Sequence, residues 1–497
     1  MKAQLKRTIC AVAAAGLIGL GGCATTPTKA EAPRLGGAAP AKSPQYGKLL
    51  GAPTAQNWVD LARVDVQWSW PRTFRELTDN FTGEVEGKFY NVSTQSDWMD
   101  VVDPKTGKVL KKISLDKASL KTVGIDSDKF KSQALPHHAY VVPGGRYIYV
   151  GNESREHDAL WVVDTQTDRL VKILRMGYVG KEKKFDTGGP LHGSFSPTEP
   201  IFLIGNVQDS KQGLVTVIDA VRHEVAGHIK TTGVNVRDVI ITRDGKWAYV
   251  GHQGWNPDKG QVAPIDLVDM KTRKVVKTFS AKDVPFMTMT YSGKYIVGSS
   301  RQGQAVIIDT AKQELIATVD LGTAEEMKQA GKKGFLETRN LEVHPNDSRA
   351  YIGIRNPPSL AIVDLKTFKL IKRVPAGEMT NTIYVGPNPK YQKLALITNE
   401  KSDFVSVIEI DTDTPKGELY MGSDTHNIAY SANGRYGAVS VLADDKLAVV
   451  DFDKELAVSQ YQVGWGSKGI RWVPYMPGLS SAKPYQDGTY LSNTAKK

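Results

Sequence analysis

Histidine recurs where the repeated apolar segments of this 497-residue chain begin. Four of the nine histidines, His137, His138, His192 and His426, fall at the starts of such segments, and His252 closes another. Neutral imidazole binds iron, copper and zinc, and it exchanges protons near neutral pH. These residues therefore predict a site for metal binding or proton transfer, provided that the fold brings the segments together.

Basic residues occupy the same level in other segments, at Arg237, Arg339 and Lys468. Guanidinium and ammonium groups pair with carboxylates, so the combined set favours a ligand that carries acidic groups. Asp186, in the loop before His192, is a candidate acid–base partner for that ring. The plainer alternative is a wet channel whose polar lining is only solvated.

The adjacent pair His137 and His138 leaves one question open. Side chains alternate along a strand, so we expect one ring to point inward and the other to pack between neighbouring units, and we favour His137 as the inward one.

One sequence motif recurs along the chain from about residue 86 onward. Each copy has an apolar run, a polar turn, and a second apolar run that closes on an acidic residue before another turn and strand. Internal repetition at this period is typical of propellers and solenoids. The closing acids are Asp103, Asp164, Asp219, Asp269, Asp309, Asp364, Glu409 and Asp451.

A second sequence motif lies between these copies and adds one more strand to each repeat unit. It contains turns such as Asp244-Gly245 and Asn433-Gly434, which are strong hairpin signals. Four strands a unit, repeated eight times, predict an all-β, eight-bladed β-propeller. The first copy lacks its first strand and residues 469–473 resemble one, so we expect a C-terminal strand to complete the first blade. Seven blades with a separate N-terminal hairpin is the alternative.

The N-terminus reads as an envelope-targeting signal. Residues 1–22 carry three basic residues and no acid, an apolar stretch and small residues before Cys23, as in a bacterial lipoprotein signal. Cys23 would carry the lipid, and an ordinary secretory signal is the alternative. The expected organisation is a signal peptide (1–22), a flexible tether (23–47), an accessory segment (48–84), the propeller (85–475) and a tail (476–497).

The repeats resemble the YVTN family of β-propellers, on residues such as 149–152 (YVGN), 396–399 (LITN) and 217–219 (VID). With eight blades, envelope targeting and histidines on the first strands, the chain resembles the haem d1 domain of cytochrome cd1 nitrite reductase. It is also similar to the NirF type of haem d1 biogenesis protein, which lacks a c-type haem domain. The absence of a C-x-x-C-H run here agrees with the second and departs from the first.

That resemblance implies a tetrapyrrole or metal ligand, with haem d1 or its precursor as the expected cofactor and no c-type haem. His137, His138, Arg237, Arg339 and Lys468 would then bind the cofactor. A catalytic role would fall to His192, His426 and Asp186, and metal binding to His192, His426 and His252.

The rest of the composition narrows the partners. The net charge of +11 falls to +8 without the signal, and no aromatic–basic stripe is present, so we expect no nucleic acid. The expected location is the periplasmic side of the cell envelope, with the outer membrane favoured, contact with the membrane only through the lipid, and other envelope redox proteins as possible partners. A non-catalytic propeller that presents a protein-binding surface is the alternative function.

Overall fold

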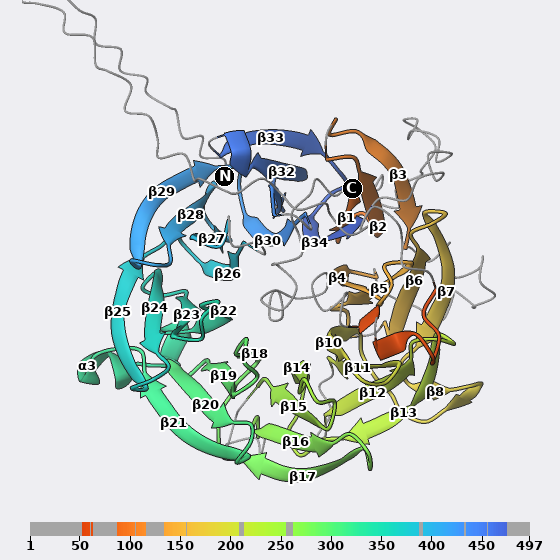
Figure 1. Ribbon diagram of the computed structural model, residues 1–497, viewed down its shortest axis with the longest axis horizontal. Coiled ribbons are helices and arrows are strands. Elements are labelled where there is room, and N and C mark those ends of the chain that lie inside the picture. The colour runs from red at the N-terminus through yellow and green to blue at the C-terminus, as the bar shows by residue number, and fades with distance from the viewer. Residues whose placement is uncertain are drawn as a thin grey trace, which may run out of the picture. The chain divides into compact units, whose positions relative to one another are not determined.

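The computed structural model describes residues 52–59, 61–62, 87–115 without 105, 134–207 without 156, 213–254, 262–386, and 391–474 without 432, 433 and 455. Within these residues the chain forms eight four-stranded antiparallel sheets arranged around a central axis (Figure 1). The expectation of an all-β, eight-bladed propeller is therefore confirmed. The predicted signal, Cys23, the tether and the tail lie outside the described residues.

The strands of each blade are named from the centre outward. Blade 1 contains β34 (Ser467–Pro474), β1 (Gly87–Ser93), β2 (Trp98–Val102) and β3 (Val109–Ser114). Blade 2 contains β4 (Pro136–Val141), β5 (Tyr147–Asn152), β6 (Ala159–Asp164) and β7 (Arg169–Arg175). Blade 3 contains β10 (Pro190–Phe195), β11 (Ile201–Asn206), β12 (Leu214–Asp219) and β13 (Glu224–Lys230). Blade 4 contains β14 (Val236–Ile241), β15 (Trp247–His252), β16 (Ile265–Asp269) and β17 (Lys274–Phe279).

The second half of the ring follows the same order. Blade 5 contains β18 (Phe286–Met289), β19 (Tyr295–Ser300), β20 (Gln304–Asp309) and β21 (Glu314–Asp320). Blade 6 contains β22 (Thr338–Val343), β23 (Arg349–Ile354), β24 (Ser359–Asp364) and β25 (Lys369–Pro375). Blade 7 contains β26 (Thr380–Val385), β27 (Leu394–Asn399), β28 (Phe404–Glu409) and β29 (Thr414–Tyr420). Blade 8 contains β30 (Thr425–Tyr430), β31 (Tyr436–Val441), β32 (Lys446–Asp451) and β33 (Ala457–Gln462).

Short elements decorate the connections between blades. They are the hairpin β8 (Tyr178–Val179) and β9 (Glu182–Lys183), the helix α3 (Ala324–Met327), and the 3₁₀ turns η5 (Lys332–Gly334) and η6 (Phe452–Lys454). No helix among the described residues is long and apolar enough to cross a membrane.

The last strand closes the ring on the first blade. β34 pairs antiparallel with β1, and Phe89 lies opposite Trp472. Their rings meet edge to face with centroids 4.8 Å apart, and both side chains are buried. Because the inner position of blade 1 is supplied by the C-terminal strand, the ring closes without an unpaired strand edge there.

The recurring acid at the end of the third strand has a local structural role. Asp164 Oδ1 accepts a hydrogen bond from the backbone N–H of Gln166 at 2.7 Å, and Asp364 Oδ1 does the same for Lys366 at 2.7 Å. A short acidic side chain that accepts from the backbone two residues on stabilises a tight turn. The repeat signature thus marks the turn from the third strand to the fourth.

Only part of the accessory segment 48–84 is described. Trp58 is fully buried, lies 6.1 Å from the ring of Phe195, and donates its indole N–H to the carbonyl of Ser196 at 2.9 Å. This part of the segment packs against blade 3, whereas Trp68 and Trp70 lie outside the described residues.

Candidate functional site

A β-bulge at the start of the inner strands positions the candidate site residues. In β4, Pro136 pairs with Asn152 and the next pair joins Ala139 to Val150, so His137 and His138 together oppose one residue of β5. A bulge of this kind interrupts the alternation of a strand and redirects its side chains. The same interruption occurs in β10, β22, β26 and β30.

The bulges show which histidines occupy equivalent positions in the inner strands. The pairs before each bulge make Pro136, Pro190 and Thr425 equivalent. His426 therefore shares the first bulge position with His137, whereas His192 shares the second with His138. The strand starts differ in sequence, so the sequence alone does not give this one-residue offset between His426 and His192.

The four rings nevertheless form one cluster at the centre of the propeller. The centroids of His137 and His138 lie 4.1 Å apart in a near-parallel stack, and those of His138 and His192 lie 4.3 Å apart. His426 meets His137 edge to face at 5.8 Å. All four side chains are buried. The expectation that His137 and His138 point to different sides is wrong, because both residues lie within the bulge, where alternation fails.

Three guanidinium groups lie across from this cluster on blades 4 and 6. Arg237 and Arg339 approach the ring of Phe286, with their guanidinium carbons 5.7 and 5.2 Å from its centroid. Arg355 follows β23 and shares the carboxylate of Glu400 with Arg339. Imidazoles thus gather on blades 8, 2 and 3, and guanidinium groups on blades 4 and 6.

Two carboxylates, which the sequence analysis missed, bridge these groups. Glu153 places one oxygen 2.7 Å from the ammonium of Lys468 and the other 3.3 Å from His137 Nε2. Glu400 lies 3.5 Å from His426 Nε2 and 3.6 Å from Arg339, and it also pairs with Arg355. Each carboxylate is the first residue after a second strand. An alignment of that position across the repeats would have found both, together with Arg301 and Arg355.

We call the four imidazoles, Arg237, Arg339, Arg355, Lys468, Glu153 and Glu400 the central cluster. Burial is the largest cause that holds the pKa of His137, His138 and His426 well below its usual range, and nearby cations lower it further. These rings are therefore neutral at pH 7, the form that can bind iron or accept a proton. Burial also lowers the pKa of Arg339 to about 10, with Arg355 adding to the effect, so this guanidinium stays charged.

Two of the predicted site residues lie elsewhere. The Asp186 carboxylate is 94% exposed and pairs with Lys183 on the β9 hairpin, so it is not placed as a partner for His192. His252 is fully buried inside blade 4, where its Nδ1 lies 2.8 Å from the carbonyl oxygen of Pro264. At the end of β15 its side chain packs toward β16 instead of the central axis, which is why strand order alone misplaced it.

The described residues contain no group of three or more His, Cys, Asp or Glu side chains arranged to hold a metal ion. His192, His426 and His252 thus do not form such a group within the described part of the chain. Ligation of a tetrapyrrole iron is a different case. The tetrapyrrole already holds its iron, so the protein needs to supply only one imidazole nitrogen and not a complete set of ligands.

The central cluster does have buried donors without acceptors. The Nε atoms of its three guanidinium groups are buried and have no hydrogen-bond partner among the described residues; they belong to Arg237, Arg339 and Arg355. Arg237 also has no ion pair within the described part of the chain, and burial lowers its pKa. A buried polar group without a partner is costly, so such donors favour an anionic ligand. The residues fit a tetrapyrrole with acidic side chains.

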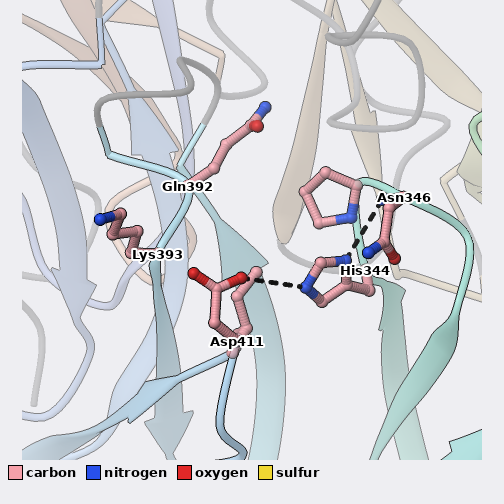
Figure 2. A pocket seen from close by; sticks show the side chains of 7 residues that line it. His344, Asn346, Gln392, Lys393 and Asp411 are labelled. Carbon is pink, nitrogen blue, oxygen red and sulfur yellow. Dashed lines mark hydrogen bonds and ion pairs between the residues drawn. The ribbon is translucent and has the colours of Figure 1, made fainter.

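A separate cavity of about 260 Å³ lies between blades 6 and 7, at the other end of β22 from Arg339 (Figure 2). His344 and Asp411 face each other across it, with Nε2 and Oδ1 3.7 Å apart. The backbone N–H of Asn346 donates to His344 Nδ1 at 3.2 Å. His344 thus holds a turn in place, the role that its His-Pro sequence predicts.

The closed ring of eight blades, with imidazoles and guanidinium groups at its centre, defines the class of this protein as an eight-bladed β-propeller with a polar centre. Residues 255–480 match the family model of the cytochrome D1 haem domain, in agreement with the resemblance to that domain in the sequence. Arg339, His426 and Lys468 fall inside the matched segment, whereas His137, His138 and His192 precede it.

No curated protein matches the chain. Among solved structures, the Kuenenia stuttgartiensis hydrazine synthase is 17% identical, with a TM-score of 0.43, over 59% of this chain and 92% of that one. The β-propeller domain of Myceliophteria thermophila Cps50 (Swd1) is 15% identical, with a TM-score of 0.43, over 57% of this chain and 89% of that one.

Proposed function

We propose that this protein binds haem d1 or a tetrapyrrole precursor of it at the central cluster, and that it acts in haem d1 biogenesis or related redox chemistry. The observation that carries the proposal is Arg237, whose Nε is buried without a hydrogen-bond partner and which has no ion pair among the described residues, within electrostatic reach of His137, His138 and His426. The match to the cytochrome D1 haem domain supports the same ligand class.

Two groups of residues in the central cluster would bind different parts of the tetrapyrrole. Arg237, Arg339 and Lys468 would pair with the acidic side chains of the tetrapyrrole, because Arg and Lys recognise carboxylates through charge-assisted hydrogen bonds. The neutral imidazoles would ligate the iron or move protons at the buried face. When bound, the tetrapyrrole supplies redox chemistry that no protein side chain offers.

The catalytic form of the proposal is a late redox step on a haem d1 precursor. His192 and His426 remain the proposed proton carriers, because both rings are buried beside other imidazoles and guanidinium groups. Asp186 has no role in the proposed redox step, because its carboxylate is exposed and pairs with Lys183. We also propose that Cys23 carries a lipid that tethers the propeller to the periplasmic side of the envelope, with the outer membrane favoured.

The test is to mix the purified full chain with haem d1, and separately with its precursor, and to record the visible spectrum. We expect shifted absorption bands at one equivalent of ligand. The shift should be lost in His192→Ala and in a variant of Arg237 or Arg339. No shift with either compound would contradict the proposal. A colourless, metal-free protein that instead co-purifies with one envelope protein would favour the non-catalytic, protein-binding alternative.

A further inference from the structure

The two carboxylates of the central cluster contact different nitrogen atoms in a consistent pattern. Glu153 approaches Nε2 of His137 at 3.3 Å, and Glu400 approaches Nε2 of His426 at 3.5 Å. Lys468 lies 2.7 Å from the other oxygen of Glu153, an arrangement that suits the ionised carboxylate. An ionised carboxylate attracts an N–H group and repels a nitrogen lone pair, so each of these Nε2 atoms is assigned the proton of its neutral ring.

The other nitrogen of each ring must then be an acceptor. For His426, Nδ1 lies 3.1 Å from the amide nitrogen of Asn427, which is a donor. Both nitrogens of His426 are therefore engaged by protein groups. For His137, Nδ1 contacts Nδ1 of His138, and since the first carries a lone pair, the second must donate its proton.

This assignment passes along the chain of contacts to a third ring. A neutral His138 that is protonated at Nδ1 has its lone pair at Nε2. The side chain of His138 is buried against His192, in the second position of the bulge. The tautomer of His138 is thus set by Glu153, a residue that does not touch it, as second-shell carboxylates commonly do for metal-ligating histidines.

We propose that Glu153 is a positioning residue which, through His137, holds His138 in the Nδ1–H tautomer, so that His138 Nε2 is the nitrogen offered to the iron of a haem-type ligand. His426, with both nitrogens engaged, orients and donates instead of ligating. The role of His138 toward iron rests on the proposed function, whereas its tautomer does not.

The first experiment reads the tautomer directly, without any ligand. The full chain labelled with ¹⁵N-histidine is studied by long-range ¹H–¹⁵N NMR at pH 7, with His138→Gln to assign the signals. We expect a protonated Nδ1 and an unprotonated Nε2 at His138, and the opposite state at His137. In Glu153→Ala, His138 should shift toward the Nε2–H form, whereas Glu400→Ala, the matched control, should leave it unchanged. An Nε2–H form in the unaltered protein, or no change in Glu153→Ala, would overturn the proposal.

The second experiment uses ferric haem b as the probe and follows the shift of its Soret band. His138→Ala should abolish the spectrum of an iron–imidazole bond, whereas His344→Ala, in a turn outside the central cluster, should keep it. Glu153→Ala should weaken binding about 10-fold or more, the usual effect of losing such an outer partner. An iron–imidazole spectrum that survives in His138→Ala would overturn the ligand assignment. If the probe fails to bind the unaltered chain, the assignment of His138 as an iron ligand fails, and the ligand-free NMR measurement still decides the relay.

Discussion

The carboxylate of Glu400 lies 3.5 Å from Nε2 of His426 and 3.6 Å from the guanidinium of Arg339. Glu400 belongs to blade 7, Arg339 to blade 6 and His426 to blade 8, so one side chain joins three blades at the centre. Its side chain is only 17% exposed. Hydrogen bonds to charged groups at such sites stabilise a fold more than those between exposed partners.

Replacing this carboxylate should therefore weaken the ring. Glu400→Gln keeps the shape but removes the charge that Arg339 and Arg355 share, and we expect a loss of about 1–3 kcal/mol in the free energy of unfolding. Urea denaturation followed by tryptophan fluorescence measures it. Glu182→Gln, at a carboxylate that pairs with Lys184 and is 71% exposed, is the control and should change stability by less than about 0.5 kcal/mol. If the two substitutions changed the free energy of unfolding equally, the proposed structural role of Glu400 would be contradicted.

Closure of the ring depends on Trp472 in β34. Its side chain is 3% exposed and meets Phe89 edge to face, so Trp472→Ala should cost about 3–5 kcal/mol in the free energy of unfolding. Trp465, which is 46% exposed in the loop before β34, provides the control, and its replacement by Ala should be nearly neutral. The check is thermal unfolding by circular dichroism. If Trp472→Ala melts like the unaltered chain, the C-terminal strand does not hold the first blade.

Asp424 should make stability depend on pH. Burial, with Glu400 adding repulsion, raises the pKa of its carboxyl from 3.8 to about 6. Between those two values the folded protein keeps a proton that the unfolded chain has released, so this contribution is fully present below about pH 4 and is lost as pH rises through 6. Because the group is partly exposed, we expect Asp424→Asn to gain only about 1 kcal/mol at pH 7 and nothing near pH 4. Unfolding curves across that range test this; a gain that is equal at both ends would contradict the raised pKa.

The architecture could be predicted because each blade carries its own signals. Acids such as Asp164 and Asp364 close the third strands because their side chains accept hydrogen bonds from the following turn, and this physical need repeats in blade after blade. The missing first strand in blade 1 and the surplus strand at the C-terminus together implied the pairing of β34 with β1. Local chemistry of this kind is visible in a single sequence.

The site could be predicted only in part. The grouping of His137, His138, His192 and His426 was predictable, because all four stand at the starts of inner strands. Their register was not, because a bulge inserts a residue without a sequence signature.

The charged partners were harder still to predict. Glu153 reaches His137 from the neighbouring strand of its own blade, whereas Glu400 reaches His426 on the next blade, and the shared position after the second strand appears only when the repeats are aligned there. His252 shows the reverse error, since a residue at a strand end can face its own blade instead of the axis.

The central claim is that Arg237, whose guanidinium has no ion pair among the described residues and whose Nε is buried, anchors an acidic tetrapyrrole. The most direct measurement is the dissociation constant of haem d1, from its visible spectrum, for the unaltered chain, for Arg237→Gln and for Arg222→Gln, whose guanidinium side chain is 70% exposed on blade 3. Loss of one charge-assisted contact should weaken binding of the Arg237 variant about 10- to 100-fold and leave the Arg222 variant unchanged. Equal affinity in all three proteins would contradict the account.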